Sequence, residues 1–246
     1  MSAPVFIAGV GAISAIGNNI AECLDAFKKE KAGMADMVYL DSVHRNKIPV
    51  AEVKFNNDEL AAISGLSPAI SRTAHLSMIA AKEAVDDAGI ENFSSLRTGF
   101  ISANTVGGMD KTENFFKAFL SDNAKGKLKN VVHHECGSIT ELVADQLAIK
   151  NYISTISTAC SSSANAIFFG ARMIKHNMLD VVVAGGADAI TKFTLNGFNT
   201  LMILDNEYCK PFDENRRGLN LGEGAGYVVL VSERVAKQLK KRAYCN

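Results

Sequence analysis

Short runs of consecutive aliphatic and β-branched residues recur along this chain, and they constrain its fold more than any other feature. Such runs lie at residues 5–10, 153–156, 181–185 and 226–231. Strands with one face in water alternate apolar and polar residues, whereas continuous apolar runs are typical of strands covered on both faces. Helical patterns separate the runs, as crossover connections between parallel strands require. The sequence therefore predicts an α/β fold, with a mixed, largely parallel sheet and helices on both faces.

The helices can be placed by their spacing and by their capping residues. Apolar residues at positions 76, 79, 80, 84 and 88 share one helix face, and Gly89 follows as a C-terminal cap. Asn19 predicts the start of a helix that runs to about Glu30. Residues 138–141 have the form of a capping box that opens a helix to about Ile149. Further expectations are loops over residues 31–70, a basic helix from about residue 232 nearly to the end, and core positions for Phe115, Phe116 and Phe119.

Charge and cysteine content exclude several classes of protein. The 246 residues carry 26 Lys and Arg against 26 Asp and Glu, so the chain lacks the basic surplus of a nucleic-acid or membrane-surface protein. Its five cysteines form no Cys-x-x-Cys pair, which disfavours a zinc ribbon or a disulfide scaffold and favours a reducing compartment. No basic residue precedes Lys28, and no apolar run approaches the length of about 20 residues that a membrane span needs. We therefore expect a soluble cytoplasmic protein that binds neither nucleic acid nor membrane.

The segment from Ser154 to Ser163 carries the strongest chemical signal. A β-branched strand ends in a cluster of small residues around Cys160, and a helical pattern begins immediately afterwards. A cysteine at the start of a helix lies beside unpaired amide N–H groups and the positive end of the helix dipole, which stabilise a thiolate. The same N–H groups can hold an oxyanion during acyl transfer. From the pattern alone, Cys160 is either such a nucleophile or a buried structural cysteine, because no base lies nearby in the sequence.

Two weaker motifs point to other chemistry but lack the context that it needs. Gly9 and Gly11 form half of a dinucleotide fingerprint, yet Ser14 stands at the third glycine and no acidic strand end follows about 20 residues later. His133, His134 and Cys136 can bind metals, but adjacent side chains point in different directions and do not converge on one ion. We therefore expect no metal and no dinucleotide cofactor.

Four motifs, in order along the chain, resemble those of one enzyme family. Residues 158–163, Thr-Ala-Cys-Ser-Ser-Ser, are similar to the nucleophile motif of the β-ketoacyl-acyl-carrier-protein synthases, the elongating condensing enzymes of fatty-acid and polyketide synthesis. Residues 10–17 resemble the opening strand and turn of that family, and residues 184–188 resemble the strand end after its nucleophile helix. Residues 210–218 and 221–226, which contain Lys-Pro-Phe-Asp and Gly-Glu-Gly-Ala-Gly, are similar to its most specific late motif.

The resemblance implies a thiolase-like fold of which this chain is one half. Family members have two similar α/β halves, and the second half supplies two active-site histidines and a lysine. None of the five histidines of this chain lies in a matching motif. Residues 1–246 are therefore expected to form the N-terminal β-ketoacyl synthase domain, with the C-terminal half absent and activity weak or lost without it.

The resemblance also implies roles for individual residues. Cys160 would accept an acyl group from acyl carrier protein, and its backbone N–H would contribute to the oxyanion hole. A decarboxylated malonyl group on a second carrier would then attack the thioester, with no metal or organic cofactor. Val106 would line the acyl pocket, and Asp213, Arg217 and Glu223 would support the site.

Partners follow from the same resemblance. We expect a homodimer with contacts at residues 100–108 and in the segment before Cys160. Residues 237–242, a basic run, are either a solvated helix face or part of a docking surface for an acidic carrier protein. Two other functions remain open: a non-catalytic subunit that sets chain length in a heterodimer, which Cys160 disfavours, and a degradative thiolase, which the motifs around Asp213 and Glu223 disfavour.

Overall fold

A five-stranded mixed sheet forms the centre of the protein in a computed structural model that describes residues 3–90, 93, 95–239 and 243–245. The strands are β1 (Val5–Ser14), β2 (Thr98–Ala103), β3 (Tyr152–Ile156), β4 (Val181–Asp188) and β5 (Gly224–Ser232). Their spatial order is β1-β5-β4-β2-β3, with parallel pairing of β3, β2 and β4 and antiparallel pairing of β5 with both β4 and β1. Four strands therefore run in one direction and β5 runs against them, which confirms the predicted largely parallel sheet.

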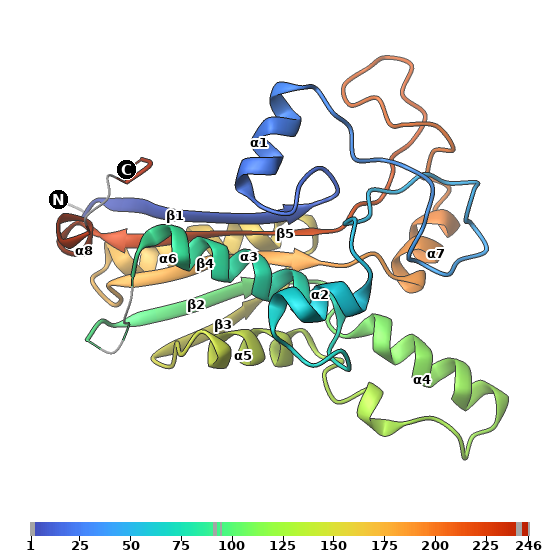
Figure 1. Cartoon of the computed structure of the whole chain (residues 1–246), viewed down its shortest axis with the longest axis horizontal. Helices are drawn as coiled ribbons and strands as arrows, with labels where there is room; N and C mark the ends of the chain where they lie inside the picture. The colour runs from blue at the N-terminus through green and yellow to red at the C-terminus, as the bar shows by residue number, and fades with distance from the viewer. Residues whose placement is uncertain (1–2, 91–92, 94, 240–242, 246) are drawn as a thin grey trace.

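Helices cover both faces of this sheet (Figure 1). On one face, α3 (Arg72–Ala88) and α5 (Cys136–Gln146) enclose the larger apolar core, which contains Phe100 and Tyr227. On the other face, α6 (Ser162–Lys175) packs on β2, β4 and β5 around Ile101 and Val182. The remaining helical elements are α1 (Ile20–Lys28), α2 (Asn57–Ser64), α4 (Met109–Ser121), η1 (Leu128–Asn130), η2 (Ala159–Ser161), α7 (Lys192–Thr200) and α8 (Glu233–Gln238).

The two N-terminal glycines allow the close packing of α3 and do not lie at a turn. Strand β1 continues past the expected end at residue 10, so Gly9 and Gly11 lie inside a strand and not at a phosphate-binding turn. A Cβ atom on Gly9 would lie 2.1 Å from the Ala84 carbonyl oxygen, and one on Gly11 would lie 2.1 Å from the Ala80 oxygen. The glycines are present because the backbone of α3 lies directly against β1.

The helix boundaries were predicted with mixed success. Asn19 caps α1 by accepting a bond from the Glu22 N–H, and Gly89 ends α3 with a φ of 69°. The predicted capping box at residues 138–141 is wrong, because α5 already begins at Cys136 and the Ser138 hydroxyl donates to the Glu135 carbonyl oxygen at 2.7 Å. The sequence interpretation missed α2 and α7. The basic C-terminal helix ends at Gln238, and residues 240–242 of the predicted run lie outside the described residues.

The expectation of core phenylalanines on α4 is also wrong. No residue of this helix is buried, and Phe116 is 55% exposed. Figure 1 shows α4 and η1 projecting away from the sheet, and α4 contacts η1 and α7, so its phenylalanines lie outside the cores on the two faces of the sheet. Within the described part of the chain, no helix is long and apolar enough to cross a membrane.

A histidine of α3 is buried against α2. His75 is fully buried, and its Nδ1 is 2.8 Å from the Ser64 hydroxyl, while Nε2 has no partner among the described residues. Burial lowers the pKa of His75 to about 4, and the charges of Lys111 and Arg72 act in the same direction. The folded protein therefore holds this imidazole neutral.

The close approach of α3 and β1 predicts that Gly9 tolerates no side chain. Gly9→Ala places a methyl group against the α3 backbone and should lower the free energy of unfolding by about 3 kcal/mol. Gly197→Ala in α7 is the matched control, since its Cβ meets nothing within 4 Å; it should raise stability by up to about 1 kcal/mol through helix propensity. Urea unfolding followed by circular dichroism measures both, and equal effects would contradict the packing argument.

The neutral state of His75 predicts an acid-sensitive fold. Because the unfolded histidine titrates near its ordinary value of 6.5 and the folded one near 4, the unfolded state binds more protons between these values. Stability should fall by up to about 3 kcal/mol as the pH drops from 6.5 to 4. His75→Gln removes this titration, so the variant should show a flatter profile in urea unfolding over that range. Parallel profiles of wild type and variant would contradict the prediction.

Candidate active site

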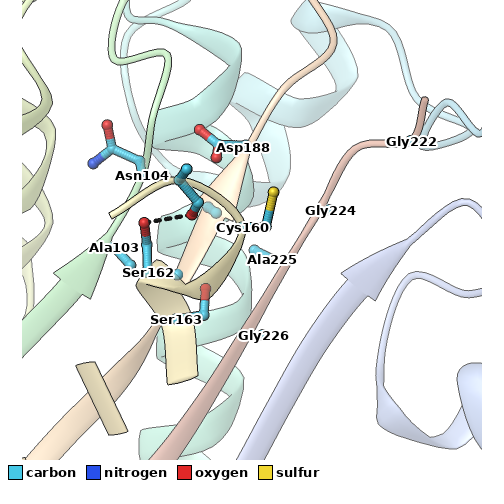
Figure 2. A pocket seen from close by; sticks show the side chains of 13 residues that line it. Ala103, Asn104, Cys160, Ser162, Ser163, Asp188, Gly222, Gly224, Ala225 and Gly226 are labelled. Atoms are coloured by element: carbon cyan, nitrogen blue, oxygen red, sulfur yellow. Dashed lines mark hydrogen bonds between the residues drawn. The ribbon is translucent and has the colours of Figure 1, made fainter. Parts of the chain in front are cut away.

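A pocket lies where the carboxyl ends of β2 and β4 and the start of β5 meet the N-terminus of α6. This edge of a parallel sheet is where α/β proteins place their ligand sites. The pocket has a volume of about 270 Å³, and Figure 2 shows Cys160, Asp188 and the start of β5 around it. Its lining residues are Ala103, Asn104, Ala159, Cys160, Ser162, Ser163, Gly186, Ala187, Asp188, Gly222, Gly224, Ala225 and Gly226.

Cys160 lies on the turn that joins β3 to α6. It is exposed, and it occupies the 3₁₀ turn η2 directly before the first residue of α6. Amide groups in the first turn of a helix have no partner within the helix, and they carry the positive end of its dipole. The preceding Ala159 has a φ of 53°, a conformation that costs a non-glycine residue of the order of 1 kcal/mol. A strained turn that presents a thiol to a pocket fits the predicted nucleophile better than a buried structural cysteine.

The side chain of Ser162 holds this turn. Its hydroxyl oxygen accepts the Thr158 N–H at 2.7 Å and donates to the Ala159 carbonyl oxygen at 2.6 Å, and Figure 2 draws a hydrogen bond at Ser162 as a dashed line. Asn165 adds a second contact by donating to the Thr158 hydroxyl at 2.8 Å. Ser162 is itself buried at the edge of the pocket. The polar residues after Cys160 thus fix the backbone that carries it.

Glycine and alanine form much of the wall of the pocket, and two of the glycines, Gly186 and Gly226, have different roles there. A Cβ on Gly186 would lie 2.4 Å from the Ser163 hydroxyl and 2.7 Å from the Ala103 carbonyl oxygen, so β4 and α6 can meet only at a glycine. A Cβ on Gly226 would meet nothing within 4 Å, so this glycine leaves open space beside the pocket. The absence of a side chain at Gly226 therefore enlarges the space next to Cys160.

Asp188 is the second ionisable side chain of the pocket. Its carboxylate accepts the Thr105 N–H and hydroxyl, both at 2.8 Å, and the Val106 N–H at 3.1 Å. Burial raises the pKa of Asp188, while the Thr105 bonds oppose that shift. Val106, predicted to line the acyl pocket, is buried behind this contact and is not among the lining residues. Its predicted role stays a prediction.

The three predicted supporting residues lie in different surroundings. Glu223 stands between two lining glycines, but its buried side chain pairs with Arg72. Arg217 is exposed and pairs with Asp205 and Glu207, each at 2.9 Å. Asp213 caps an exposed turn by accepting the Asn215 N–H at 2.7 Å. Only Glu223 therefore adjoins the pocket.

Among the described residues, the pocket contains no base stronger than a carboxylate. Its lining includes no histidine, lysine or arginine. His134, from the segment that carries metal-capable side chains, instead approaches the Thr112 hydroxyl at 2.9 Å. In the described ranges, no group of three or more His, Cys, Asp and Glu residues is placed to hold a metal ion. The ionisable side chains of the described lining are therefore the Cys160 thiol and the Asp188 carboxyl group.

Sequence interpretation missed the roles of Asn104, Ser162 and Asp188. Asn104 accepts the Gly107 N–H at 3.2 Å and donates to the Cys136 carbonyl oxygen at 3.2 Å, so it shapes the turn after β2. Asn104 and Asp188 each follow or end an apolar run, and this position in the sequence could have marked them as residues of the site. Nothing local could identify the partners, which lie up to 83 residues away.

The contacts of Ser162 predict a loss of stability when its hydroxyl is removed. Ser162→Ala leaves the Thr158 N–H without its partner and should lower the free energy of unfolding by about 1–3 kcal/mol. Ser138→Ala is the matched control, because this half-buried serine also donates to the carbonyl oxygen three residues earlier near the start of a helix, but accepts no backbone N–H of the described residues in return; its effect should stay within about 0.5 kcal/mol. Equal losses in urea unfolding would contradict the role assigned to Ser162.

Comparison with known proteins identifies the family of this chain. The family model "Beta-ketoacyl synthase, N-terminal domain" matches residues 2–236. Nodulation protein E of Rhizobium meliloti is 28% identical over 94% of this chain and 58% of its own length. The 3-oxoacyl-[acyl-carrier-protein] synthase 2 of Coxiella burnetii is 28% identical over 98% of this chain and 60% of its own. The chain thus spans about three fifths of these curated relatives.

A solved structure shows the same fold. "The ishigamide ketosynthase/chain length factor" superposes with a TM-score of 0.89 at 24% identity, covering 99% of this chain and 62% of that one. The match assigns this fold to one half of a thiolase-like architecture, as predicted. With its family model matched over nearly its whole length, the chain belongs to the β-ketoacyl synthase family, in which it corresponds to the N-terminal domain.

Proposed function

We propose that this chain carries the acyl-accepting half of a β-ketoacyl-acyl-carrier-protein synthase, an acyltransferase of fatty-acid or polyketide chain elongation. One observation carries the proposal: the exposed thiol of Cys160 stands on a strained turn at the N-terminus of α6 and faces a pocket lined by small residues. The family membership and the name of the Coxiella burnetii relative support it.

The chemistry of this proposal begins with transfer of an acyl group to Cys160. The Sγ atom attacks the carbonyl carbon of an acyl thioester, and the Cys160 N–H helps to hold the oxyanion that forms. The carrier thiolate then leaves and takes up a proton, so the acyl group remains as a thioester on Cys160. Covalent storage divides one difficult condensation into easier steps.

Carbon–carbon bond formation completes the cycle. A malonyl thioester loses carbon dioxide, and its carbanion attacks the carbonyl carbon of the Cys160 thioester. The Cys160 thiolate is released with formation of a β-ketoacyl product two carbons longer. These steps need proton transfer and charge stabilisation that the described pocket lacks, so we propose that histidines of a C-terminal half supply them.

The outer side of α6 supports a covering C-terminal half. Phe168 on this side is 61% exposed although α6 is a central helix of the fold. About two fifths of the length of each of these curated relatives has no counterpart in this chain. A second domain that covers α6 would bury this apolar side chain.

We further propose a homodimer that takes acyl groups from acyl carrier protein. Of the predicted contact segment at residues 100–108, residues 100–103 belong to the buried strand β2, which pairs with β3 and β4 and has no free edge for strand pairing with a second copy. The contact through this segment stays a prediction. Strand β3, in the segment before Cys160, pairs only with β2 and offers a free edge. Free cysteines favour a cytoplasmic setting for the enzyme.

The test is covalent labelling of Cys160 by cerulenin, a cysteine-directed inhibitor of condensing enzymes. Intact mass should show a single adduct on the wild-type protein and none on Cys160→Ala. Labelling of this chain would mean that the nucleophile is active without the second half, and labelling only of a longer gene product would mean that both halves build the site. Absence of an adduct from both forms would contradict the synthase and favour a non-catalytic partner subunit.

A further inference from the structure

A buried ion pair lies directly behind the pocket wall and joins α3 to the start of β5. Glu223 stands between Gly222 and Gly224, which both line the pocket. Its own side chain is 2% exposed and pairs with the 8% exposed side chain of Arg72. The Arg72 Nη2 lies 2.6 Å from Glu223 Oε1, and Nε lies 3.0 and 2.9 Å from the two carboxylate oxygens.

The pair is the centre of a fully connected network. The Glu223 carboxylate also accepts the Val53 N–H at 2.9 Å and the Ile190 N–H at 3.2 Å. Arg72 donates further bonds to the Asn57 side-chain oxygen at 3.0 Å and to the Val53 carbonyl oxygen at 3.1 Å. One carboxylate therefore ties the start of β5 to α3, to the segment at Val53 and to the chain that leaves β4.

This arrangement favours a positioning role over a general contribution to stability. Removing two charges from water costs nearly as much as their attraction returns, so a buried ion pair is weak evidence for stability. Gly222 and Gly224 have no side chains with which to fix the wall near Cys160, and Glu223 is the residue between them. Ile190, held by the same carboxylate, follows two residues after the lining residue Asp188.

We propose that Arg72 and Glu223 are positioning residues that set the distance between the glycine wall of β5 and the thiol of Cys160, and so determine how an acyl thioester is seated for attack. This inference rests on the function proposed above. It assigns Arg72, which lies 151 residues before Glu223, to the acyl-transfer site although it touches no substrate.

The experiment compares two reactions of Cys160 in whichever form of the protein takes up cerulenin. Acylation by octanoyl-pantetheine requires the thioester to be seated in the pocket, whereas alkylation by iodoacetamide requires only an accessible thiol. Glu223→Gln keeps the size of the side chain but presents an amide to the Arg72 guanidinium. Its acylation rate should fall by about 10- to 100-fold, as expected for a small displacement of reacting groups, while alkylation stays close to wild type.

Asp180→Asn is the matched control. Asp180 is another buried carboxylate in ion pairs, with Arg97 and Arg234, but it precedes β4 at the opposite end of that strand. This variant should leave the ratio of acylation to alkylation unchanged, whatever its effect on thermal unfolding. If Glu223→Gln fails to fold, Arg72→Lys keeps the positive charge and loses the planar fork, and it should lower the same ratio by a smaller factor.

The possible failures are distinguishable. If cerulenin labels the wild-type protein, but the ratio of acylation to alkylation is the same in the wild type and in the folded variant, the positioning role is overturned. The proposed function is unaffected by that result. Equal losses of acylation and alkylation, or the same fall in Asp180→Asn, also overturn the positioning role, because they indicate a general structural defect. A wild-type protein that is neither labelled nor acylated contradicts the proposed function and the inference with it.

Discussion

The contact between the backbones of α3 and β1 is the constraint on which the rest of the structure depends. Two glycines allow the helix to lie against the strand without intervening side chains, and this contact fixes both the height and the direction of α3 over the sheet. The N-terminus of α3 carries Arg72 to Glu223, and Glu223 holds the start of β5. A packing contact in one layer thus determines where a pocket wall stands in another.

The pocket likewise exists because the residues around it have small side chains or none. Small residues at the ends of β2, β4 and β5 leave a space in front of α6, and the turn before α6 places a thiol in it. Backbone N–H groups that donate to the Ser162 hydroxyl and to the Asp188 carboxylate hold the surrounding turns in place. The arrangement places an exposed thiol beside the N-terminus of α6, with no histidine or lysine among the described lining residues.

The sequence allowed the fold class and the turn that carries Cys160 before α6 to be predicted, because both depend on local patterns. Uninterrupted apolar runs marked the strands, and the small residues between β3 and α6 marked the turn at Cys160. What it could not reveal were long-range partners: the ion pair of Arg72 with Glu223 joins residues 151 positions apart. Helix α7 was missed because its capping residues are Thr191 and Thr194, and threonine at the second position is not a usual signal. The phenylalanines of α4 were misplaced because an amphipathic pattern does not say what covers it.

The exposure of Cys160 has a consequence for the lifetime of an acyl-enzyme. A thioester at this sulfur would have solvent beside it, and water would compete with any carbon nucleophile for the same carbonyl carbon. The fate of the acyl group would then be hydrolysis unless something shields it. A domain that covers α6 would therefore do more than contribute catalytic groups. By excluding water, it would favour extension of the bound acyl chain over its hydrolysis.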